Sequence, residues 1–317
     1  GVLVIALMLA TTLLTATHSE AITSARSHHS RSSERSVPTS EWRGVTLERV
    51  KPLRPILRAL RAHRHRPIVR IVFQAGRGPS YYETSVKRIS RNAYVLGELL
   101  DSDGVRATTR AQVRTRAERF VKTFGSQVDV WEVGNELNGE WLGNPKSIIA
   151  KTVAAYDVVT DAGDPTAITL NYWPSHDCYA HPWERTVPFA RRLPARIRHG
   201  ADYLLLSFYE TACRPRAHPT VGDFAHVFRR LKGVFTSSKV GMGEIGAQRA
   251  SDGVSRPRLD EKKRIANTYY GMQQTLASRL GSRFIGGYFW WYYAHDAVPR
   301  RRPHSLWPTL ERLFNSY

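Results

Sequence analysis

Two glutamates follow two separate apolar runs, and together they could hydrolyse a glycosidic bond. Residues 130–134 precede Asn135 and Glu136, and residues 239–243 precede Glu244. Short apolar runs of this kind are typical of buried strands. Glycosidic bond hydrolysis uses two carboxyl groups, one as an acid and the other as a base or a nucleophile. The sequence therefore predicts that Glu136 and Glu244 form a catalytic pair.

The elements that must position this pair alternate along the chain. Strand patterns cover residues 42–46, 67–73, 93–99, 128–134, 167–171, 203–208, 239–243 and 284–292. Helix patterns cover residues 48–65, 80–91, 106–124, 145–162, 183–198, 221–235, 259–280 and 306–314. This alternation predicts a parallel sheet of the α/β class, and eight repeats fit a single-domain (β/α)8 TIM barrel. An open doubly wound sheet is the alternative, but it usually carries a Gly-rich turn after the first strand, which this chain lacks.

Polar and aromatic side chains gather where the predicted strands end. The chemistry of a (β/α)8 barrel takes place at the C-terminal ends of its strands. The residues expected to bind substrate there are Arg70, Glu98, Asn135, Trp141, Asn171, Tyr209, Trp290 and Trp291. A structural role could explain any one of them, whereas their convergence favours a shared site. Glu98 and Glu210 are rival carboxylates near the rim, and Glu132, one layer deeper, is expected to be structural.

This arrangement resembles the retaining glycoside hydrolases of the large (β/α)8 clan, called clan A or the 4/7 superfamily. The resemblance covers residues 42–317 and depends first on the Asn-Glu pair of the fourth strand and the Glu of the seventh. Arg70 resembles the strand-two arginine that supports the nucleophile. Tyr209 resembles the strand-six tyrosine that hydrogen-bonds the nucleophile. Residues 286–291, Gly-Gly-Tyr-Phe-Trp-Trp, resemble the strand-eight tryptophan floor of the sugar subsite.

The chain departs from the clan at two positions. Leu137 replaces the usual Pro of the Asn-Glu-Pro motif, and Ser207 stands where many members have His. The variant looks like a poorly characterised cellulase-like bacterial branch, so the resemblance does not specify the sugar.

The resemblance implies double displacement, with Glu244 as nucleophile and Glu136 as acid/base. It implies carboxyl groups about 5–5.5 Å apart, with Asn135 holding the 2-hydroxyl of the sugar. The pKa of Glu136 should lie above that of a free Glu, because ionised Glu244 is close. The chemistry requires no metal or organic cofactor.

The chain is strongly basic, with a formal net charge of +20. Residues 1–42 carry equal numbers of Arg and Glu, so the excess lies on the predicted barrel. Such a surface could favour acidic glycans, anionic cell walls or nucleic acid. The cations are scattered without interleaved aromatics, so we expect no specific nucleic-acid partner. Two alternatives to the enzyme remain: a catalytically silent glycan-binding barrel, and an anionic-polymer binder that uses the basic surface. The sequence gives no signal for an oligomeric state.

The N-terminal part carries export signals. Residues 1–17 hold an apolar run that suits a signal peptide or an N-terminal anchor. Residues 18–41 are rich in Ser, Arg and His and are expected to form a disordered linker to the catalytic domain, residues 42–317. Cys178 and Cys213 both follow successive strands, and an even count in an exported chain favours a disulfide between them. We therefore expect a secreted or cell-envelope protein, with membrane contact only through an uncleaved N-terminal segment.

Overall fold

The computed structural model describes residues 36–247 and 258–317, which form one compact unit. The predicted signal peptide or anchor and most of the predicted linker lie outside the described residues. Among these residues, no helix has the length and apolar character that crossing a bilayer requires.

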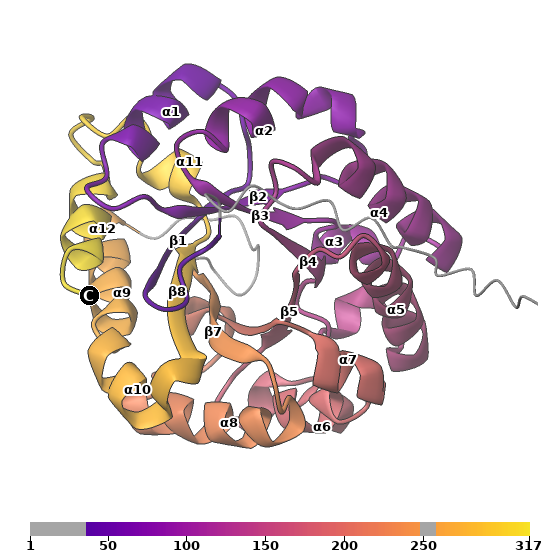
Figure 1. Ribbon diagram of the computed structural model, residues 1–317. Coiled ribbons are helices and arrows are strands. Elements are labelled where there is room, and N and C mark those ends of the chain that lie inside the picture. The colour runs from indigo at the N-terminus through magenta and orange to yellow at the C-terminus, as the bar shows by residue number, and fades with distance from the viewer. Residues whose placement is uncertain (1–35, 248–257) are drawn as a thin grey trace, which may run out of the picture. The chain divides into compact units, whose positions relative to one another are not determined.

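Eight parallel strands close into a barrel in chain order (Figure 1). The strands are β1 (Trp42–Leu47), β2 (Ile68–Val72), β3 (Tyr94–Glu98), β4 (Val130–Gly134), β5 (Thr166–Asn171), β6 (Tyr203–Phe208), β7 (Lys239–Ile245) and β8 (Phe284–Trp290). Each strand pairs with the next one, and β8 pairs with β1. The predicted single-domain (β/α)8 barrel is therefore confirmed.

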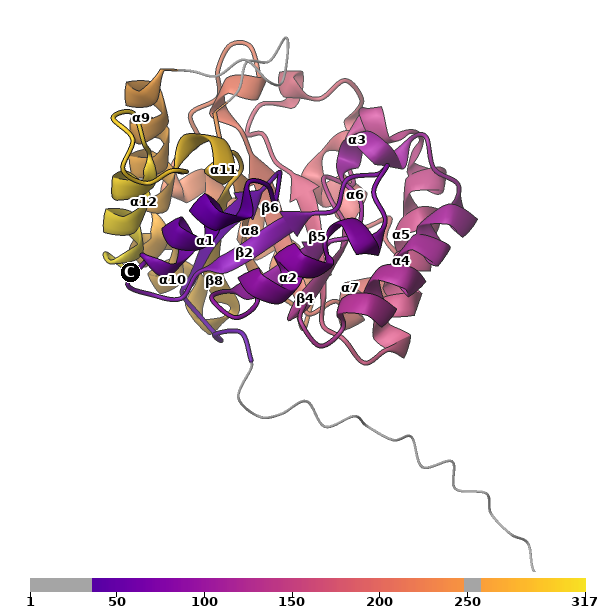
Figure 2. The same cartoon turned by 90° about the horizontal axis from the view of Figure 1, so that it is seen from above.

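Helices surround this barrel on the outside, and Figure 2 shows the same ring in a view turned by 90°. They are α1 (Leu53–Arg61), α2 (Glu83–Ile89), α4 (Arg110–Phe124), α5 (Pro145–Asp161), α6 (Thr186–Ala190), α7 (Ala195–Gly200), α8 (Val221–Val234), α9 (Leu259–Tyr270), α10 (Gln273–Leu280) and α12 (Trp307–Phe314). Two short helices, α3 (Ser102–Val105) and α11 (Tyr293–Asp296), lie in the loops after β3 and β8.

Several predicted helices differ from the observed ones, among them the first, which was expected over residues 48–65 and covers Leu53–Arg61. The helix expected over residues 106–124 begins at Arg110, because Thr109 forms a capping box with Gln112. The helix expected over residues 183–198 is divided into α6 and α7, since Pro194 has no N–H to continue a helix. The helix expected over residues 259–280 is interrupted at Gly271, between α9 and α10.

The interior of the barrel changes from apolar to polar toward the C-terminal ends of the strands. One apolar cluster takes residues from most strands: Trp42, Ile68, Leu96, Val130, Ala167, Leu205, Ile285 and Phe289. Successive strand side chains alternate between faces, so the residue two positions later also points inward. Those next residues are polar and buried: Arg70, Glu98, Glu132, Thr169 and Ser207. The strand pattern itself thus builds a polar layer beneath the barrel mouth.

The described end of the predicted linker packs against the opposite, apolar end of the barrel. Val37 contacts the apolar interior cluster, and the Trp42 indole N–H donates to the Pro38 carbonyl at 2.7 Å. Residues 37 and 38 therefore help to close the end of the barrel that lies away from the polar layer.

Candidate active site

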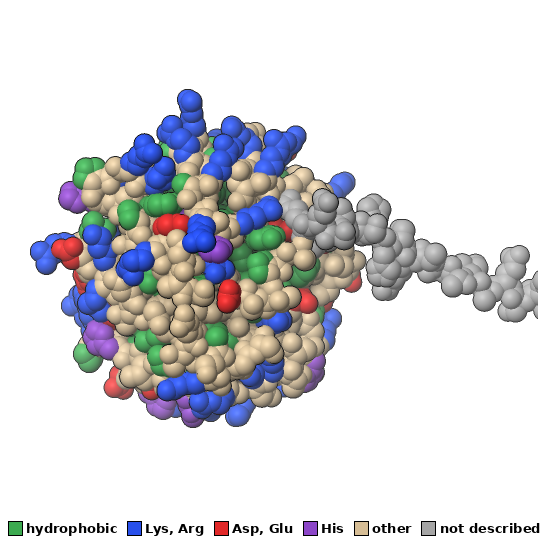
Figure 3. All heavy atoms as spheres, turned by 60° about the vertical axis from the view of Figure 1, so that its left-hand side comes forward, with side chains coloured by type: hydrophobic (Ala, Val, Ile, Leu, Met, Phe, Trp, Pro, Cys, Tyr) green, Lys and Arg blue, Asp and Glu red, His purple; other side chains and the backbone are tan. Residues whose placement is uncertain are grey.

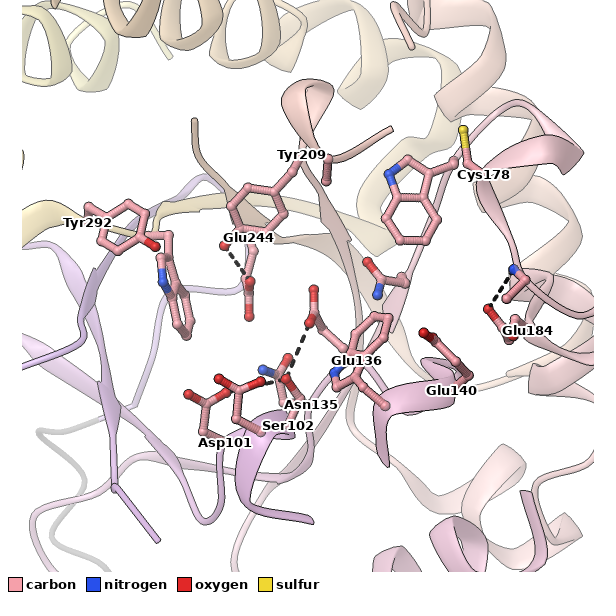
Figure 4. Close-up of a pocket in the computed structure, with 17 residues that line it drawn as sticks. Asp101, Ser102, Asn135, Glu136, Glu140, Cys178, Glu184, Tyr209, Glu244 and Tyr292 are labelled. Carbon is pink, nitrogen blue, oxygen red and sulfur yellow. Dashed lines mark hydrogen bonds between the residues drawn. The ribbon is translucent and has the colours of Figure 1, made fainter. Parts of the chain in front are cut away.

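A cavity of about 630 Å³ lies at the C-terminal ends of the strands (Figure 4). Its size is typical of small-molecule and sugar sites. It is lined by Asp101, Ser102, Asp103, Asn135, Glu136, Glu140, Trp141, Asn171, Trp173, Cys178, Ala180, Glu184, Tyr209, Ala212, Glu244, Trp291 and Tyr292. Glu136 and Glu244, the predicted pair, both face this cavity.

A bulge in β7 aims Glu244 into the cavity. The register between β6 and β7 shifts after Leu206, so that Ser207 pairs with Glu244 instead of Gly243. Gly243 faces the barrel interior, where a Cβ would lie 2.8 Å from Leu205. Strict alternation would then send Glu244 outward, toward the helices. The extra residue reverses this direction, which is a known use of bulges beside active sites.

Two side chains stabilise the Glu244 carboxylate. The buried Arg70 guanidinium donates to Glu244 Oε1, and the Tyr209 hydroxyl donates to Glu244 Oε2 at 2.7 Å. Hydrogen bonds to a charged carboxylate are stronger than those between neutral groups. These are the two contacts that the resemblance implied for a nucleophile.

Glu136 follows β4 in an unusual backbone conformation. Its φ is +48°, in the left-handed region that non-glycine residues rarely adopt. This turn lets Asn135 and Glu136 both face the cavity, although neighbours along a strand point to opposite sides. Such strain costs about 1–3 kcal/mol and is concentrated at functional sites in proteins.

Ser207 lies between the two glutamates. Its hydroxyl donates to Glu136 Oε1 at 2.6 Å and lies 3.3 Å from Glu244 Oε2. Since Ser207 Oγ is 2.6 Å from the Glu136 oxygen and 3.3 Å from the Glu244 oxygen, these two carboxylate oxygens lie at most about 5.9 Å apart. Carboxyl pairs stand about 5–5.5 Å apart in retaining glycosidases and about 6.5–9.5 Å apart in inverting ones. This upper limit for the two oxygens lies below the inverting range and is consistent with the retaining class.

The surroundings favour a protonated Glu136. Burial raises the pKa of Glu136 well above its usual value, and the nearby Glu244 charge raises it further, against the hydrogen bond from Ser207. Burial is therefore a larger cause than the neighbouring charge from which the raised pKa was predicted. Asp101, on the same wall, has a pKa raised to about 6, first by burial and then by Glu244.

Arg70 and Glu98 do not reach the cavity, which corrects their prediction as substrate-binding residues. Both are fully buried in the polar layer. Arg70 donates twice to Glu132, at 2.6 and 2.8 Å, and lies 3.2 Å from Glu98. Burial lowers the pKa of Arg70, but the carboxylates outweigh it and hold that pKa well above the usual value. Arg70 therefore supports Glu244 from below, and Glu132 has the structural position expected of it.

The two strand-eight tryptophans separate. Trp291 lines the cavity, with the Arg70 guanidinium 5.3 Å from its ring centroid. Trp290 is fully buried among the outer core residues, and its indole N–H donates to Asp296 at 3.0 Å. Its prediction as a substrate-binding residue is therefore corrected: Phe289 points inward, so alternation directs Trp290 outward and Trp291 back to the cavity.

Three residues that line the cavity have buried polar atoms without a protein partner. Asn135 Oδ1 and Asn171 Nδ2 belong to side chains that are 1% and 2% exposed, and Trp173 Nε1 is buried too. A buried polar atom without a hydrogen bond is costly and rare. Together with Trp141, these groups offer hydrogen bonds and flat apolar surface to a ligand.

A disulfide joins Cys178 to Cys213, as predicted, with a Cα–Cα distance of 5.5 Å. The two cysteines lie after β5 and β6, and Cys178 lines the cavity. The bond ties together two loops that frame the site.

Sequence reasoning missed several groups that line the cavity. Asp101, Ser102 and Asp103 lie in the loop shortly after β3, a stretch with no helix or strand pattern to draw attention to it. Glu184 was placed inside a continuous helix, whereas it ends a short 3₁₀ turn, Pro182–Glu184. The rival Glu210 does not line the cavity; its carboxylate is bound by Arg264 and by the Tyr269 hydroxyl at 2.8 Å.

Comparisons with known proteins support the fold. No protein-family model and no curated protein matches this chain. A GH10 protein from Paenibacillus barcinonensis superposes with a TM-score of 0.59 at 14% identity, covering 88% of this chain and 95% of that one. A family 1 β-glucosidase from Thermotoga maritima gives 0.58 at 10% identity, covering 82% and 84%. A glucosidase from Croceicoccus marinus gives 0.55 at 13% identity, covering 87% and 68%. The resemblance to (β/α)8 glycosidases is thus confirmed at the level of the fold.

Proposed function

We propose that this protein is a retaining glycoside hydrolase that cleaves a β-linked poly- or oligosaccharide, with Glu136 as acid/base and Glu244 as nucleophile. The observation that carries the proposal is the placement of both carboxylates around the Ser207 hydroxyl. Its oxygen lies 2.6 Å from Glu136 Oε1 and 3.3 Å from Glu244 Oε2, so these two oxygens are no more than about 5.9 Å apart. That spacing leaves room for one anomeric carbon and one glycosidic oxygen, but not for a water between base and sugar.

In the first step, a Glu244 oxygen attacks the anomeric carbon while the bond to the glycosidic oxygen breaks. Glu136 gives its proton to the departing oxygen, so the leaving group departs as a neutral alcohol. The raised pKa of Glu136, caused by burial and by Glu244, keeps that proton available. Arg70 and Tyr209 hold the attacking carboxylate in one orientation.

In the second step, water attacks the anomeric carbon of the glycosyl-enzyme. Glu136, now ionised, takes a proton from that water, and the bond to Glu244 breaks. The sugar leaves with its original anomeric configuration, and both glutamates return to their starting states. Asn135 and Asn171 supply buried amide groups for sugar hydroxyls, and Trp291 supplies a flat wall.

The cystine adds a proposal about location. Structural disulfides persist in oxidising compartments and are rare in the cytosol. The Cys178–Cys213 bond is therefore consistent with a secreted or cell-envelope enzyme.

The test is hydrolysis of aryl β-glycosides, β-glucans, mannans and xylans by wild type, Glu136→Gln and Glu244→Gln. Glu118→Gln on the exposed surface of α4 is the matched control, because it removes the same charge far from the cavity. We expect both cavity variants to lose at least about 10³-fold in kcat and the control to keep its rate. Proton NMR of the first-formed product should show retained configuration.

Three other outcomes have defined meanings. Glycan binding without turnover on the whole panel would replace the enzyme with a silent glycan-binding barrel. If the protein instead binds an anionic polymer, if that binding weakens steeply as salt rises, and if no glycan is bound or cleaved, the basic surface would be the functional part of the protein. An inverted product would contradict the assignment of Glu244 as nucleophile.

A further inference from the structure

The cavity and the whole protein differ in the sign of their charge. The chain has a net charge of +20. Six of the described residues that line the cavity are acidic: Asp101, Asp103, Glu136, Glu140, Glu184 and Glu244. None of those lining residues is Lys, Arg or His. The proposed reaction uses two of these carboxylates, so four remain to be explained.

Glu140 and Glu184 form a pair at one end of the cavity. Glu184 is 2% exposed; its Oε2 accepts from the Ala180 N–H at 3.2 Å, and its Oε1 has no partner. Burial, and then the Glu140 charge, raise the pKa of Glu184. Across the described residues, no ion pair joins either carboxylate to a Lys or Arg; His181 lowers the pKa of Glu184 by its charge, and Arg106 contacts the Glu140 backbone carbonyl at 2.8 Å.

This pair lies on the leaving-group side. Figure 4 shows Tyr292 and Glu244 at one end, Glu136 in the middle, and Glu140 and Glu184 beyond it. The nucleophile attacks the anomeric carbon from one side, and the acid protonates the oxygen on the other. The part of the substrate that departs therefore lies on the Glu136 side of the cleaved bond, the side on which Figure 4 shows Glu140 and Glu184.

We propose that this end of the cavity binds a positively charged leaving group, the ammonium of an amino sugar, between Glu140 and Glu184. The inference rests on the proposed glycosidase and specifies its substrate class as a glycoside that contains unacetylated amino sugar. An ammonium has three donors, which suit the unpartnered Glu184 oxygen and the Glu140 carboxylate that lines the same end of the cavity (Figure 4). Its charge also removes the repulsion between them.

Other ligands fit these residues less well. A uronic acid would add a further negative charge to a cavity that already has six carboxyl groups. A metal ion needs a denser cluster, and the described residues contain no group of three or more His, Cys, Asp or Glu side chains that could hold one. A neutral hydroxyl could donate to Glu184, but it would leave the charges of Glu140 and Glu184 uncompensated.

The experiment measures binding of three β-1,4-linked tetrasaccharides that differ at C2. They are the glucosamine tetramer, cellotetraose and the N-acetylglucosamine tetramer, with ammonium, hydroxyl and acetamide groups. Binding is measured by calorimetry in the Glu244→Gln background, so that no substrate is consumed. The Glu244→Gln protein is compared with the Glu184→Gln, Glu244→Gln double variant. Glu140→Gln is the second variant, in case loss of the buried Glu184 charge impairs folding. Glu118→Gln on α4 is the matched surface control.

We expect the glucosamine tetramer to bind at least about tenfold more tightly than cellotetraose, and Glu184→Gln or Glu140→Gln to remove most of that preference. Raising the salt concentration should weaken the ammonium-bearing ligand selectively. Equal or weaker binding of the glucosamine tetramer would overturn the inference, as would an equal loss for all three ligands. Failure of the glycosidase is a separate result: the preference would then appear in binding while wild type cleaves no substrate. If wild type hydrolyses a glycoside but shows no preference for the glucosamine tetramer, the glycosidase proposal stands and the ammonium site is refuted.

Discussion

Replacing Arg70 with Met tests the electrostatic layer under the cavity. Arg70 is fully buried and is the cation for three carboxylates: Glu132 through two hydrogen bonds of 2.6 and 2.8 Å, Glu98 at 3.2 Å, and Glu244. Met retains a long side chain but has no charge. The variant would therefore leave three buried carboxylates without their common partner.

The expected loss follows from those contacts. Removing one partner of a buried ion pair costs about 3–5 kcal/mol. Burial already raises the pKa of Glu98 well above its usual value, so this carboxyl can take up a proton and soften the loss. We expect Arg70→Met to reduce the free energy of unfolding by about 3 kcal/mol at pH 7, near the lower limit. In a domain of this size, that corresponds to a Tm decrease of roughly 6–12 °C.

The assay is urea denaturation at pH 7 and pH 5, followed by tryptophan fluorescence. Carboxyls that lose Arg70 have pKa values raised in the folded state above those in the unfolded chain. Groups of this kind favour folding at low pH and lose that contribution as the pH rises. The deficit of Arg70→Met should therefore be smaller at pH 5 than at pH 7. Arg58→Met on the exposed face of α1 is the matched control, with a change within about 0.5 kcal/mol. Wild-type stability for Arg70→Met at pH 7, or a deficit independent of pH, would refute the reasoning.

Three further variants test the site. Tyr209→Phe removes a 2.7 Å hydrogen bond to Glu244 and should reduce kcat/KM about tenfold or more, with an unchanged circular dichroism spectrum; an unaltered rate would contradict the support of the nucleophile. Ser207→Ala removes a bond that lowers the pKa of Glu136 against the upward effect of burial. Because the reaction needs protonated Glu136, the alkaline limb of its pH–rate profile should move to higher pH, and movement to lower pH would refute this. Cys178→Ser opens a loop with a sequence separation of 35 and should cost about 4 kcal/mol of unfolding free energy by denaturant titration; equal stability with and without a reductant would argue against the bond.

The barrel could be predicted because its signals are local and repeated. Each strand has an apolar run, and each crossover helix has its own amphipathic face and end signals. The errors lie where one residue changes the outcome. Pro194 ends a helix that the apolar pattern alone would continue, and Thr109 begins one that the same pattern would start earlier. The pattern records which residues prefer burial, but the caps depend on single side chains.

The candidate pair could be predicted only in part. The sequence places Glu136 and Glu244 at strand ends, but the direction of each side chain depends on the backbone. Glu136 needs a φ of +48°, and Glu244 needs a one-residue register shift between β6 and β7. Neither feature has a reliable signature in local sequence. The alternation rule was available for Trp290 and Trp291, and applying it from Phe289 would have assigned Trp290 to the outer core.

The basic surface and the acidic cavity are separated on the molecule, so their effects can be tested independently. Figure 3 shows many Lys and Arg side chains on one face of the molecule, densest along its upper edge. α1 alone exposes Arg54, Arg58 and Arg61. At physiological ionic strength, exposed charges act over about 8 Å, whereas buried groups are screened much less. The external cations can therefore attract an anionic polymer without neutralising the cavity carboxylates. Salt should release such a polymer long before it affects hydrolysis of a neutral aryl glycoside, so the two activities can be separated in one titration.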